Sequence, residues 1–262
     1  EKDIDRYSRN IVLPEIGGDG QKKLLKSKVL IIGAGGLGSP IILYLAASGV
    51  GNITIIDDDS IELSNLQRQV IHNSNTIGVS KAINAKNMAL QINPSININA
   101  IQARFNLLNA TSLIKDHDII ADGSDNFKTR FIAGDHCFIN KKTLVSAAIL
   151  KYEGQITVWN SNIKNKPCYR CLFPEQPKAI SSANCSEAGI LGPLAGIMGS
   201  IQAAEIIKEI LKIGSSLVGY IQLFDILNHR VRKIKINKDP KCFLCSKKKI
   251  TANVKEEAFY EK

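Results

Sequence analysis

The stretch that decides the fold reads V-L-I-I-G-A-G-G-L-G and runs from Val29 to Gly38. Its four apolar residues predict a buried strand, and its glycines predict a tight turn into an apolar helix from Pro40 to Ser48. A second apolar strand, Ile53 to Ile56, is followed by Asp57. This order is typical of a nucleotide-binding unit, because glycine lets backbone N–H groups approach phosphate and a helix N-terminus favours anions.

The turn contributes Gly33, Gly35 and Gly38, and Asp57 contributes a carboxylate that can accept hydrogen bonds from ribose hydroxyls. By itself the pattern favours an NAD(P)-dependent oxidoreductase, which is one alternative for this chain. Such an enzyme also needs a proton donor for its carbonyl substrate, and the sequence offers no recognisable one.

Composition limits the class of protein. The chain has 262 residues, of which 44% are hydrophobic and 22% charged, which fits one large α/β domain or two small ones. No apolar run reaches the ~20 residues of a membrane span, and the first residues do not resemble a signal peptide, so we expect a cytoplasmic protein without membrane contact. The net charge of +10 suits a lysine-rich solvated surface, or attraction to nucleotide phosphates and an acidic protein partner. The lysines are scattered and no base-reading motif accompanies them, so we expect no nucleic acid binding.

Strands and helices alternate up to about residue 150, which predicts a parallel, doubly wound sheet of the Rossmann type. Beyond it, alternating residues predict antiparallel strands that extend the sheet. Helices are expected at Ile4 to Leu13, Gly20 to Lys26 (capped by Asp19), Lys81 to Gln91 (capped by Ser80), Leu107 to Lys115, Phe127 to Asn140 and Leu194 to Ile213. Further strands are expected at Ile96 to Ile101, Asp118 to Ala121, Thr143 to Ala147, Tyr152 to Trp159, Leu217 to Phe224 and Val231 to Ile236.

We expect a single domain over residues 1–262. It has an N-terminal helical arm (1–27), a nucleotide-binding half (28–150), a half with the antiparallel strands, a zinc knuckle and a crossover loop (151–250), and a disordered tail (251–262).

A polar segment, Ser64-Asn-Leu-Gln-Arg-Gln69, follows the acid shortly after the second strand. Arg68 could fork onto phosphate oxygens, and Lys81 would offer a compact positive charge at the same edge of the sheet. The alternative is an ordinary polar loop.

Asp122 and Asp125 follow the fourth predicted parallel strand, where ligands bind in such sheets. Both are plausible Mg²⁺ ligands, since Mg²⁺ takes one or two carboxylates together with substrate phosphates. The alternative is a cap for the next helix, a role that suits Asp122 or Ser124 better than Asp125.

Four of the six cysteines form two C-x-x-C pairs, Cys168/Cys171 and Cys242/Cys245. Four thiolates make a closed, structural zinc site, although only folding could bring these distant pairs together. A redox role is an alternative, weakened because neither pair opens an obvious helix, and four unrelated cysteines are another.

Cys185 lies alone in a polar loop and could be a nucleophile or a spare cysteine. Cys137 is expected in the core. The four histidines form no cluster, and we assign them no role.

The motifs occur together in one order. They are R-Y-S-R-N-I (Arg6 to Ile11), G-A-G-G-L-G (Gly33 to Gly38), the strand end at Asp57, S-N-L-Q-R-Q (Ser64 to Gln69), Lys81, D-G-S-D-N (Asp122 to Asn126), E-G-Q-I-T-V (Glu153 to Val158), C-Y-R-C (Cys168 to Cys171) and C-F-L-C (Cys242 to Cys245). Together they resemble the ThiF/MoeB/HesA family, bacterial relatives of the ubiquitin-activating enzymes, over nearly the whole chain.

The resemblance implies an ATP-dependent adenylyltransferase. Family members join the C-terminal Gly-Gly carboxylate of a small ubiquitin-fold sulfur carrier, ThiS-like or MoaD-like, to AMP and release pyrophosphate. The acyl-adenylate then accepts sulfur in thiamine or molybdenum-cofactor biosynthesis. Adenylation needs positioning, cations and Mg²⁺ rather than a protein nucleophile, which agrees with the residues present.

By this resemblance Asp57 holds the ribose, Gly36 lies against the nucleotide and Asp125 binds Mg²⁺. The residues assigned to the phosphates are Asn65, Arg68, Gln69 and Lys81, and the neighbouring Ser64, Leu66, Gln67 and Asn126 belong to the same ATP site.

In the family the arginine that matches Arg9 reaches across a homodimer into the partner's site, and the cysteine that matches Cys185 lies in a loop crossing the carrier's tail. The D-D-D at Asp57 to Asp59, C-L-F-P at Cys171 to Pro174 and L-F-D at Leu223 to Asp225 favour a ThiF-like over a MoeB-like member. Larger relatives carry a C-terminal rhodanese domain. Since this chain ends soon after the second knuckle, we expect sulfur to come from a separate cysteine desulfurase or rhodanese. A non-catalytic carrier-binding scaffold and a tRNA-modifying relative remain alternatives.

Overall fold

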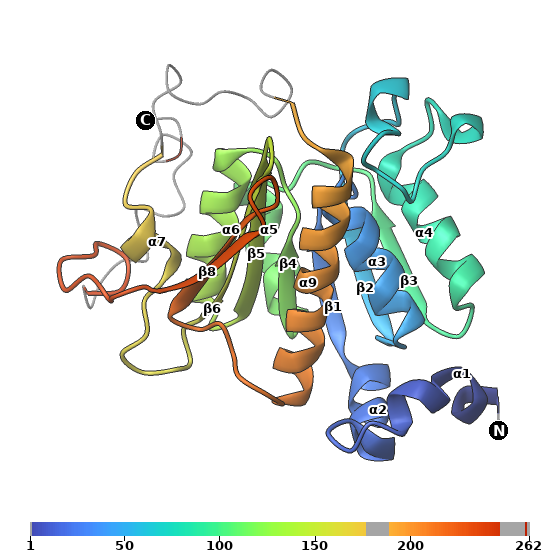
Figure 1. Cartoon of the computed structure of the whole chain (residues 1–262), viewed down its shortest axis with the longest axis horizontal. Coiled ribbons are helices and arrows are strands. Elements are labelled where there is room, and N and C mark those ends of the chain that lie inside the picture. Colours follow the sequence, from blue (N-terminus) through green and yellow to red (C-terminus); the bar gives the residue numbers. More distant parts are fainter. Residues whose placement is uncertain (1, 177–188, 247–259, 261–262) are drawn as a thin grey trace.

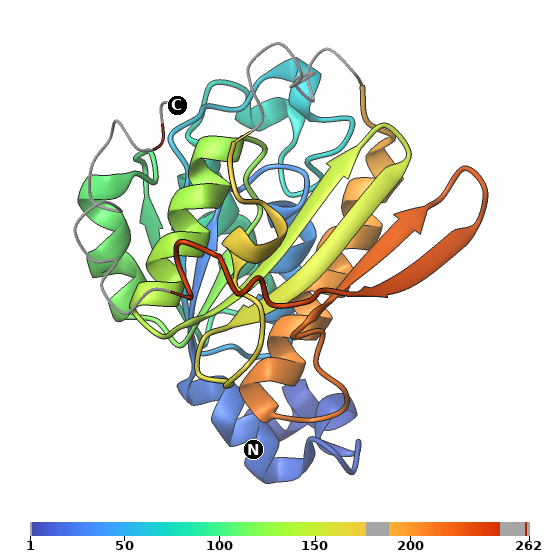
Figure 2. The same cartoon turned by 90° about the vertical axis from the view of Figure 1, so that its left-hand side faces the viewer.

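The computed structural model describes residues 2–176, 189–246 and 260. Its centre is an eight-stranded sheet in the order β3-β2-β1-β4-β5-β6-β7-β8 (Figures 1 and 2). The strands are β1 Lys28–Ile32, β2 Asn52–Ile56, β3 Asn97–Ile101, β4 Ile119–Asp122, β5 Thr143–Leu150, β6 Glu153–Asn160, β7 Tyr220–Asp225 and β8 Arg230–Lys235.

The first five strands of the chain are mutually parallel, and β6, β7 and β8 are each antiparallel to the strand before them in the sheet. This confirms the prediction of a mixed sheet with a parallel N-terminal half. The parallel strands all end at one edge of the sheet, called here the carboxyl edge.

The apolar strands are buried on both faces, and alternate residues enter two separate cores. In β1, Val29 and Ile31 belong to the core under α3 (Gly38–Ala47), α4 (Lys81–Ile92) and α9 (Gly192–Leu211). Leu30 and Ile32 belong to the core under α5 (Leu107–Lys115) and α6 (Phe127–Ile139). All four residues of the run V-L-I-I are apolar because each side chain packs against a layer of helices on one face of the sheet or the other.

The helix ends show why some capping predictions held and others failed. Ser80 caps α4, as predicted, by accepting a hydrogen bond from Ile83 N–H. Asn126 caps α6 by accepting from Thr129 N–H, so the choice of Asp122 or Ser124 was wrong. Asp19 lies inside α2 (Gly17–Lys26) rather than at its start.

Helices α1 (Lys2–Ile11) and α2 form an arm at the edge where the strands begin (Figure 1). Asn93 donates to the buried hydroxyl of Tyr7 at 2.8 Å, and Arg6 donates to the carbonyl of Ile92 at the end of α4. Arg9 is exposed and belongs to α1, so it is part of this arm, whereas the glycine turn lies at the carboxyl edge of the sheet.

Two shorter features complete the described chain. The cysteine knuckle contains a four-residue helix, α7 (Tyr169–Leu172), and 3-10 turns occupy Leu63–Asn65 and Ser74–Thr76. The tail expected to be disordered lies outside the described residues except Tyr260, which is 2% exposed. None of the helices in the described ranges combines the length and apolar character that crossing a membrane requires.

Candidate nucleotide site and cysteine cluster

The glycine turn brings the loops after β1 and β4 into direct contact. Gly33 has a φ of +91°, in the region that favours glycine, and a Cβ on it would lie 3.0 Å from the carbonyl oxygen of Gly123. A Cβ on Gly38 would lie 2.1 Å from the carbonyl oxygen of Gly33, so no other residue fits there. The turn therefore presents bare backbone at the carboxyl edge, as a phosphate-binding turn requires.

Asp57 is held against this turn by backbone hydrogen bonds. Its Oδ2 accepts from Ala34 N–H at 2.7 Å, and its Oδ1 accepts from Asp59 N–H at 2.9 Å. Burial raises the pKa of the Asp57 carboxyl, and the two backbone hydrogen bonds oppose that effect. Each oxygen retains a lone pair, so the carboxylate can still accept from the two hydroxyls of a ribose.

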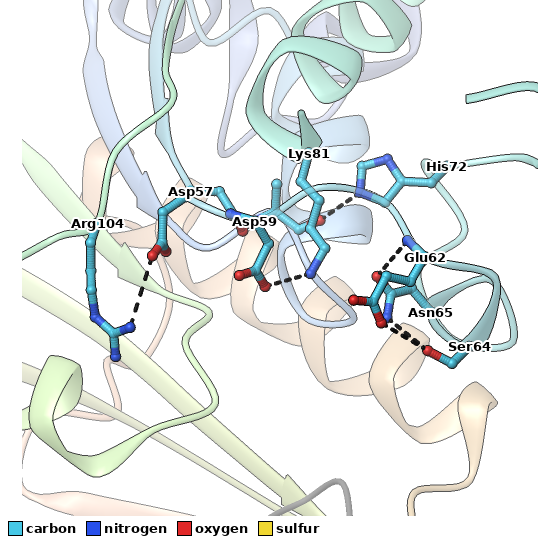
Figure 3. A network of polar contacts seen from close by, with 10 residues as sticks. Asp57, Asp59, Glu62, Ser64, Asn65, His72, Lys81 and Arg104 are labelled. Carbon is cyan, nitrogen blue, oxygen red and sulfur yellow. Dashed lines mark hydrogen bonds and ion pairs between the residues drawn. The ribbon is translucent and has the colours of Figure 1, made fainter. Parts of the chain in front are cut away.

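Lys81 stands beside this acid at the first residue of α4 (Figure 3). Its Nζ lies 2.7 Å from Oδ2 of Asp59, and the lysine side chain is 8% exposed whereas the aspartate side chain is 64% exposed. Asp59 occupies one of the three ammonium donors, which leaves two for phosphate oxygens.

Asp57, Asp58 and Asp59 form an acidic group in which one carboxylate oxygen of each residue lies within 4.8 Å of the others. Arg104, which follows β3, approaches Asp58 at 3.8 Å. Lys81 and Arg104 therefore offset part of this negative charge at the carboxyl edge.

The polar segment from Ser64 to Gln69 lines the same edge as a short 3-10 turn and the residues after it. Asn65 is buried and its Oδ1 accepts from Glu62 N–H, while Arg68 spends one guanidinium N–H on the carbonyl of Ser64. Gln69 is 4% exposed, and its Oε1 has no hydrogen-bond partner among the described residues. Ser64 and Gln67 are exposed and Leu66 is half-buried.

The sequence did not predict that the start of α9 covers this segment. A Cβ on Gly192 would lie 2.3 Å from the backbone oxygen of Gln67, and a Cβ on Gly36 would lie 3.2 Å from the side-chain Cβ of Ala195. Gly36 thus lies between Arg68 and α9. These two neighbours narrow the space through which a ligand can reach the glycine turn.

His72 was also missed, because sequence reasoning assigned the histidines no role. Its Nδ1 accepts from the Asn84 amide at 2.8 Å, so its Nε2 carries the proton and donates to the carbonyl of Ala34 at 2.9 Å. Burial lowers the pKa of His72, which favours the neutral ring. His72 therefore holds the carbonyl group of Ala34, the residue whose N–H donates to Asp57.

The two acids at the end of β4 and in the loop after it have different surroundings. Asp122 is fully buried and accepts from Ser124 N–H and Oγ–H and from Ser146 Oγ–H, so it holds the loop and is not available as a metal ligand. Asp125 is exposed and lines a cavity of about 380 Å³.

That cavity extends from the loop after β4 along β5, β6, β7 and β8. Its wall combines apolar residues such as Phe173 and Phe224 with the charged side chains of Arg230 and Arg232. Arg130, another residue that sequence reasoning missed, lines it and donates to the carbonyls of Ala147 and Ser124. The acids Glu153 and Asp225 also line it, so the cavity offers an apolar channel whose wall carries charges of both signs, starting at Asp125.

The four predicted zinc ligands come together on the side of the sheet away from α9. Their sulfur atoms all lie within 4.8 Å of one another, and the Cys168–Cys171, Cys168–Cys242 and Cys171–Cys245 distances are 3.8, 3.6 and 3.4 Å. Sulfurs bound tetrahedrally at ~2.3 Å from zinc are about 3.8 Å apart. The donor set and its spacing fit a structural zinc site, and unrelated cysteines are excluded.

One detail of the redox argument was wrong, since Cys168 does precede a short helix, α7. Hydrogen bonds from Cys168 and Cys245 lower the pKa of the Cys171 thiol. The closure of all four sulfurs around one point nevertheless favours metal binding over an isolated redox pair. Cys185 lies outside the described residues.

Comparison with known proteins agrees with this geometry. Residues 7–244 match the ThiF family. The chain is 38% identical over 248 residues to the sulfur carrier protein adenylyltransferase of Thermus thermophilus, with 94% of this chain and 92% of that protein covered. It is 44% identical over 259 residues to the adenylyltransferase and sulfurtransferase MOCS3 of Xenopus laevis, with 98% and 57% covered.

The chain spans about half the length of several curated relatives that it matches, MOCS3 proteins among them. A crystal structure of Escherichia coli MccB with ATP superposes with a TM-score of 0.79 at 24% identity, covering 92% of this chain and 75% of that one, which establishes a common fold. Given the match over most of its length and the 38% identity to a relative of similar size, the chain belongs to the ThiF family.

Proposed function

We propose that this protein is an ATP-dependent adenylyltransferase that activates the C-terminal Gly-Gly carboxylate of a small ubiquitin-fold sulfur carrier. The observation that carries the proposal is the place of the loop after β4. Its Gly123 packs against the nucleotide turn at Gly33, and two residues later Asp125 opens the 380 Å³ cavity. A nucleotide on the turn and a chain terminus in the cavity would meet at this loop.

In the proposed reaction a carrier carboxylate oxygen attacks the α-phosphorus of ATP. A new P–O bond forms, the bond between the α-phosphorus and the bridging oxygen breaks, and pyrophosphate leaves with the electron pair. Arg68 and Lys81 supply donors to the charge that develops on the phosphates. Asp57 would hold the ribose, with Gly36, Gln69 and the rest of the polar segment around the nucleotide.

Mg²⁺ and zinc would have separate roles. Asp125 is exposed, unlike Asp122, and its carboxylate could take Mg²⁺ together with phosphate oxygens. Bound there, Mg²⁺ would neutralise phosphate charge. The four cysteines would hold zinc in a closed structural site.

The carrier's extended tail would enter the cavity between β5 and β8. An extended Gly-Gly end is narrow, which suits an apolar channel whose wall carries charges of both signs, Arg230 and Arg232 among them. A ThiF-like role in thiamine synthesis is preferred to a MoeB-like role in molybdenum-cofactor synthesis, and a cytoplasmic location belongs to the same proposal.

Arg9 would complete the site of a second copy of the chain. Helix α1, which carries Arg9, lies at the edge where the strands begin and the glycine turn lies at the carboxyl edge, which favours a contribution across a homodimer. The sulfur would come from a separate cysteine desulfurase or rhodanese. A covalent link between Cys185 and the carrier would form after adenylation, if it forms at all.

The test is carrier-dependent exchange of labelled pyrophosphate into ATP, with purified ThiS-like and MoaD-like carriers. Asp125→Ala should lower exchange about 10²–10³-fold while carrier binding is largely retained. Asp116→Ala, an exposed aspartate at the end of α5, is the matched control and should exchange normally. Absence of exchange with every carrier, in folded protein with Mg²⁺, would refute the proposal in favour of a binding scaffold.

A further inference from the structure

A second cavity, of about 120 Å³, lies between α6, the end of β6 and the segment that leads to the cysteine knuckle. It is separate from the 380 Å³ cavity, with which it shares only Tyr169. One water needs roughly 10–15 Å³ of such volume, so the cavity has room for a group of several atoms.

Two hydrogen-bond donors in its wall are buried and unpartnered. Trp159 is 5% exposed, its ring stacks edge-on against Tyr169 at 5.8 Å, and its Nε1 has no partner among the described residues. The Oγ of Ser161, two residues later, is equally buried and unpartnered. A buried donor without a partner costs about 1–3 kcal/mol, so two in one cavity favour the binding of an acceptor from outside the chain.

The charge of the wall identifies the kind of acceptor. Among the described residues that line the cavity, four are lysines, Lys142, Lys164, Lys166 and Lys238, and none is an aspartate or glutamate. A zinc ion with four thiolates is a negative group nearby and would account for some of this positive charge. It does not account for the Trp159 and Ser161 donors, which make no hydrogen bond to a cysteine sulfur.

We propose that this cavity binds a small tetrahedral oxyanion, phosphate or sulfate. Trp159 Nε1–H and Ser161 Oγ–H donate to its oxygens, and the lysines neutralise its charge. At about 120 Å³ the cavity is too small to enclose a nucleotide, so the proposed ligand is the free ion. The site lies beside Cys168 and would stabilise the junction between β6 and the knuckle.

The chain itself supplies the probe, because Trp159 is its only tryptophan. The ¹⁵N-labelled full-length protein should give a single indole N–H resonance. Titration with potassium phosphate, with ionic strength held constant by potassium chloride, should move that resonance in a saturable way. Ser161→Ala should weaken the apparent affinity about tenfold, and Lys142→Met should weaken it as well.

Two controls separate this site from others. Lys22→Met, which removes an exposed lysine on α2, should leave the titration unchanged. Arg68→Ala should also leave it unchanged, because it removes a phosphate donor at the nucleotide edge. A resonance that stays fixed up to about 50 mM phosphate, or moves equally with chloride, refutes the proposal. So does a shift that is lost in Arg68→Ala but retained in both Ser161→Ala and Lys142→Met.

Discussion

Two cation–carboxylate pairs of nearly equal length occupy opposite environments in this protein. At the carboxyl edge, Lys81 Nζ lies 2.7 Å from an Asp59 side chain that is 64% exposed. Beside the cysteine cluster, Arg170 lies 2.6 Å from Asp135, and the two side chains are 4% and 0% exposed. In the first pair the lysine is buried but its carboxylate partner is open to solvent, whereas in the second pair both side chains are closed inside the protein.

The closed pair is embedded in a network. Arg170 donates from Nε and Nη2 to Asp135, and its guanidinium lies 4.2 Å from the centre of the Phe131 ring. Tyr260 donates its hydroxyl to the same carboxylate, which attaches a residue of the C-terminal segment to α6. Burial raises the pKa of Asp135 despite these partners. Equal distances therefore do not imply equal roles. Solvent access decides whether an ion pair can bind a ligand or only stabilises the fold.

Zinc removal should have the largest effect on stability, because the cysteine cluster lies beside the buried ion pair of Arg170 and Asp135. One zinc per chain should be present, and its chelation should lower the thermal midpoint by about 10 °C, because metal binding free energy is folding free energy. Zinc content and calorimetry measure this. Cys245→Ser should lose the metal, whereas Cys137→Ser, in the α6 core, should retain it. A metal-free protein with an unchanged midpoint would contradict the assignment.

The buried pair should cost nearly as much to break. Arg170→Met should lower the free energy of unfolding by about 3–5 kcal/mol, because Asp135 is left buried without its countercharge. Urea denaturation measures it, and Lys22→Met, which breaks an exposed pair with Asp19, serves as the control with a change below about 1 kcal/mol. Similar losses in the two variants would mean that burial does not distinguish the pairs.

Lys81→Met should reduce activity but not stability, in contrast to Arg170→Met. We expect pyrophosphate exchange to fall about 10²-fold or more, because a phosphate donor is lost. The free energy of unfolding should change by less than about 1 kcal/mol, because methionine keeps the buried stem and Asp59 is rehydrated at the surface. Denaturation and exchange are measured on the same preparation. A Lys81→Met variant that is destabilised but still active would contradict the assignment of Lys81 to the phosphates.

The smallest expected effect is a pH dependence from His72. Its pKa is lowered in the folded state by burial, so below its ordinary value the unfolded chain binds a proton more readily. The stability that His72 contributes should be complete above about pH 6.5 and should be lost as the pH falls through the lowered value. Unfolding free energies at pH 5 and pH 7.5 should therefore differ less in His72→Gln than in the unchanged protein. An identical difference in both would exclude His72 as the source.

Much of the fold was predictable because its signals are local. The V-L-I-I strand, the glycine turn and the alternating pattern after residue 150 each depend on neighbours a few positions apart, and most element ends fell within a few residues of their predicted positions. The cap of α6 was misplaced because several side chains in D-G-S-D-N are competent caps, and only backbone geometry selects Asn126.

Other parts of the site were not predictable because they depend on contacts between distant segments. His72 bonds to Ala34, 38 positions away, and nothing in a solitary histidine indicates that partner. The contact of α9 with Gln67 and the unpartnered donors at Trp159 and Ser161 likewise exist only in the folded chain. The two cysteine pairs could be proposed as one site, but their closure required folding across 74 positions.

The sequence by itself determined the sheet, the nucleotide turn and the residue types at the carboxyl edge, because apolar periodicity and glycine's conformational freedom act over short ranges. The tertiary structure alone decided which charges stay accessible. Asp122 and Asp125 lie three positions apart, one at the end of β4 and one in the loop after it, yet one is buried and satisfied by serine hydroxyls and the other lines a cavity. Burial is a property of the packed elements around a residue, so the same carboxylate chemistry becomes a brace in one place and a ligand-binding group in the other.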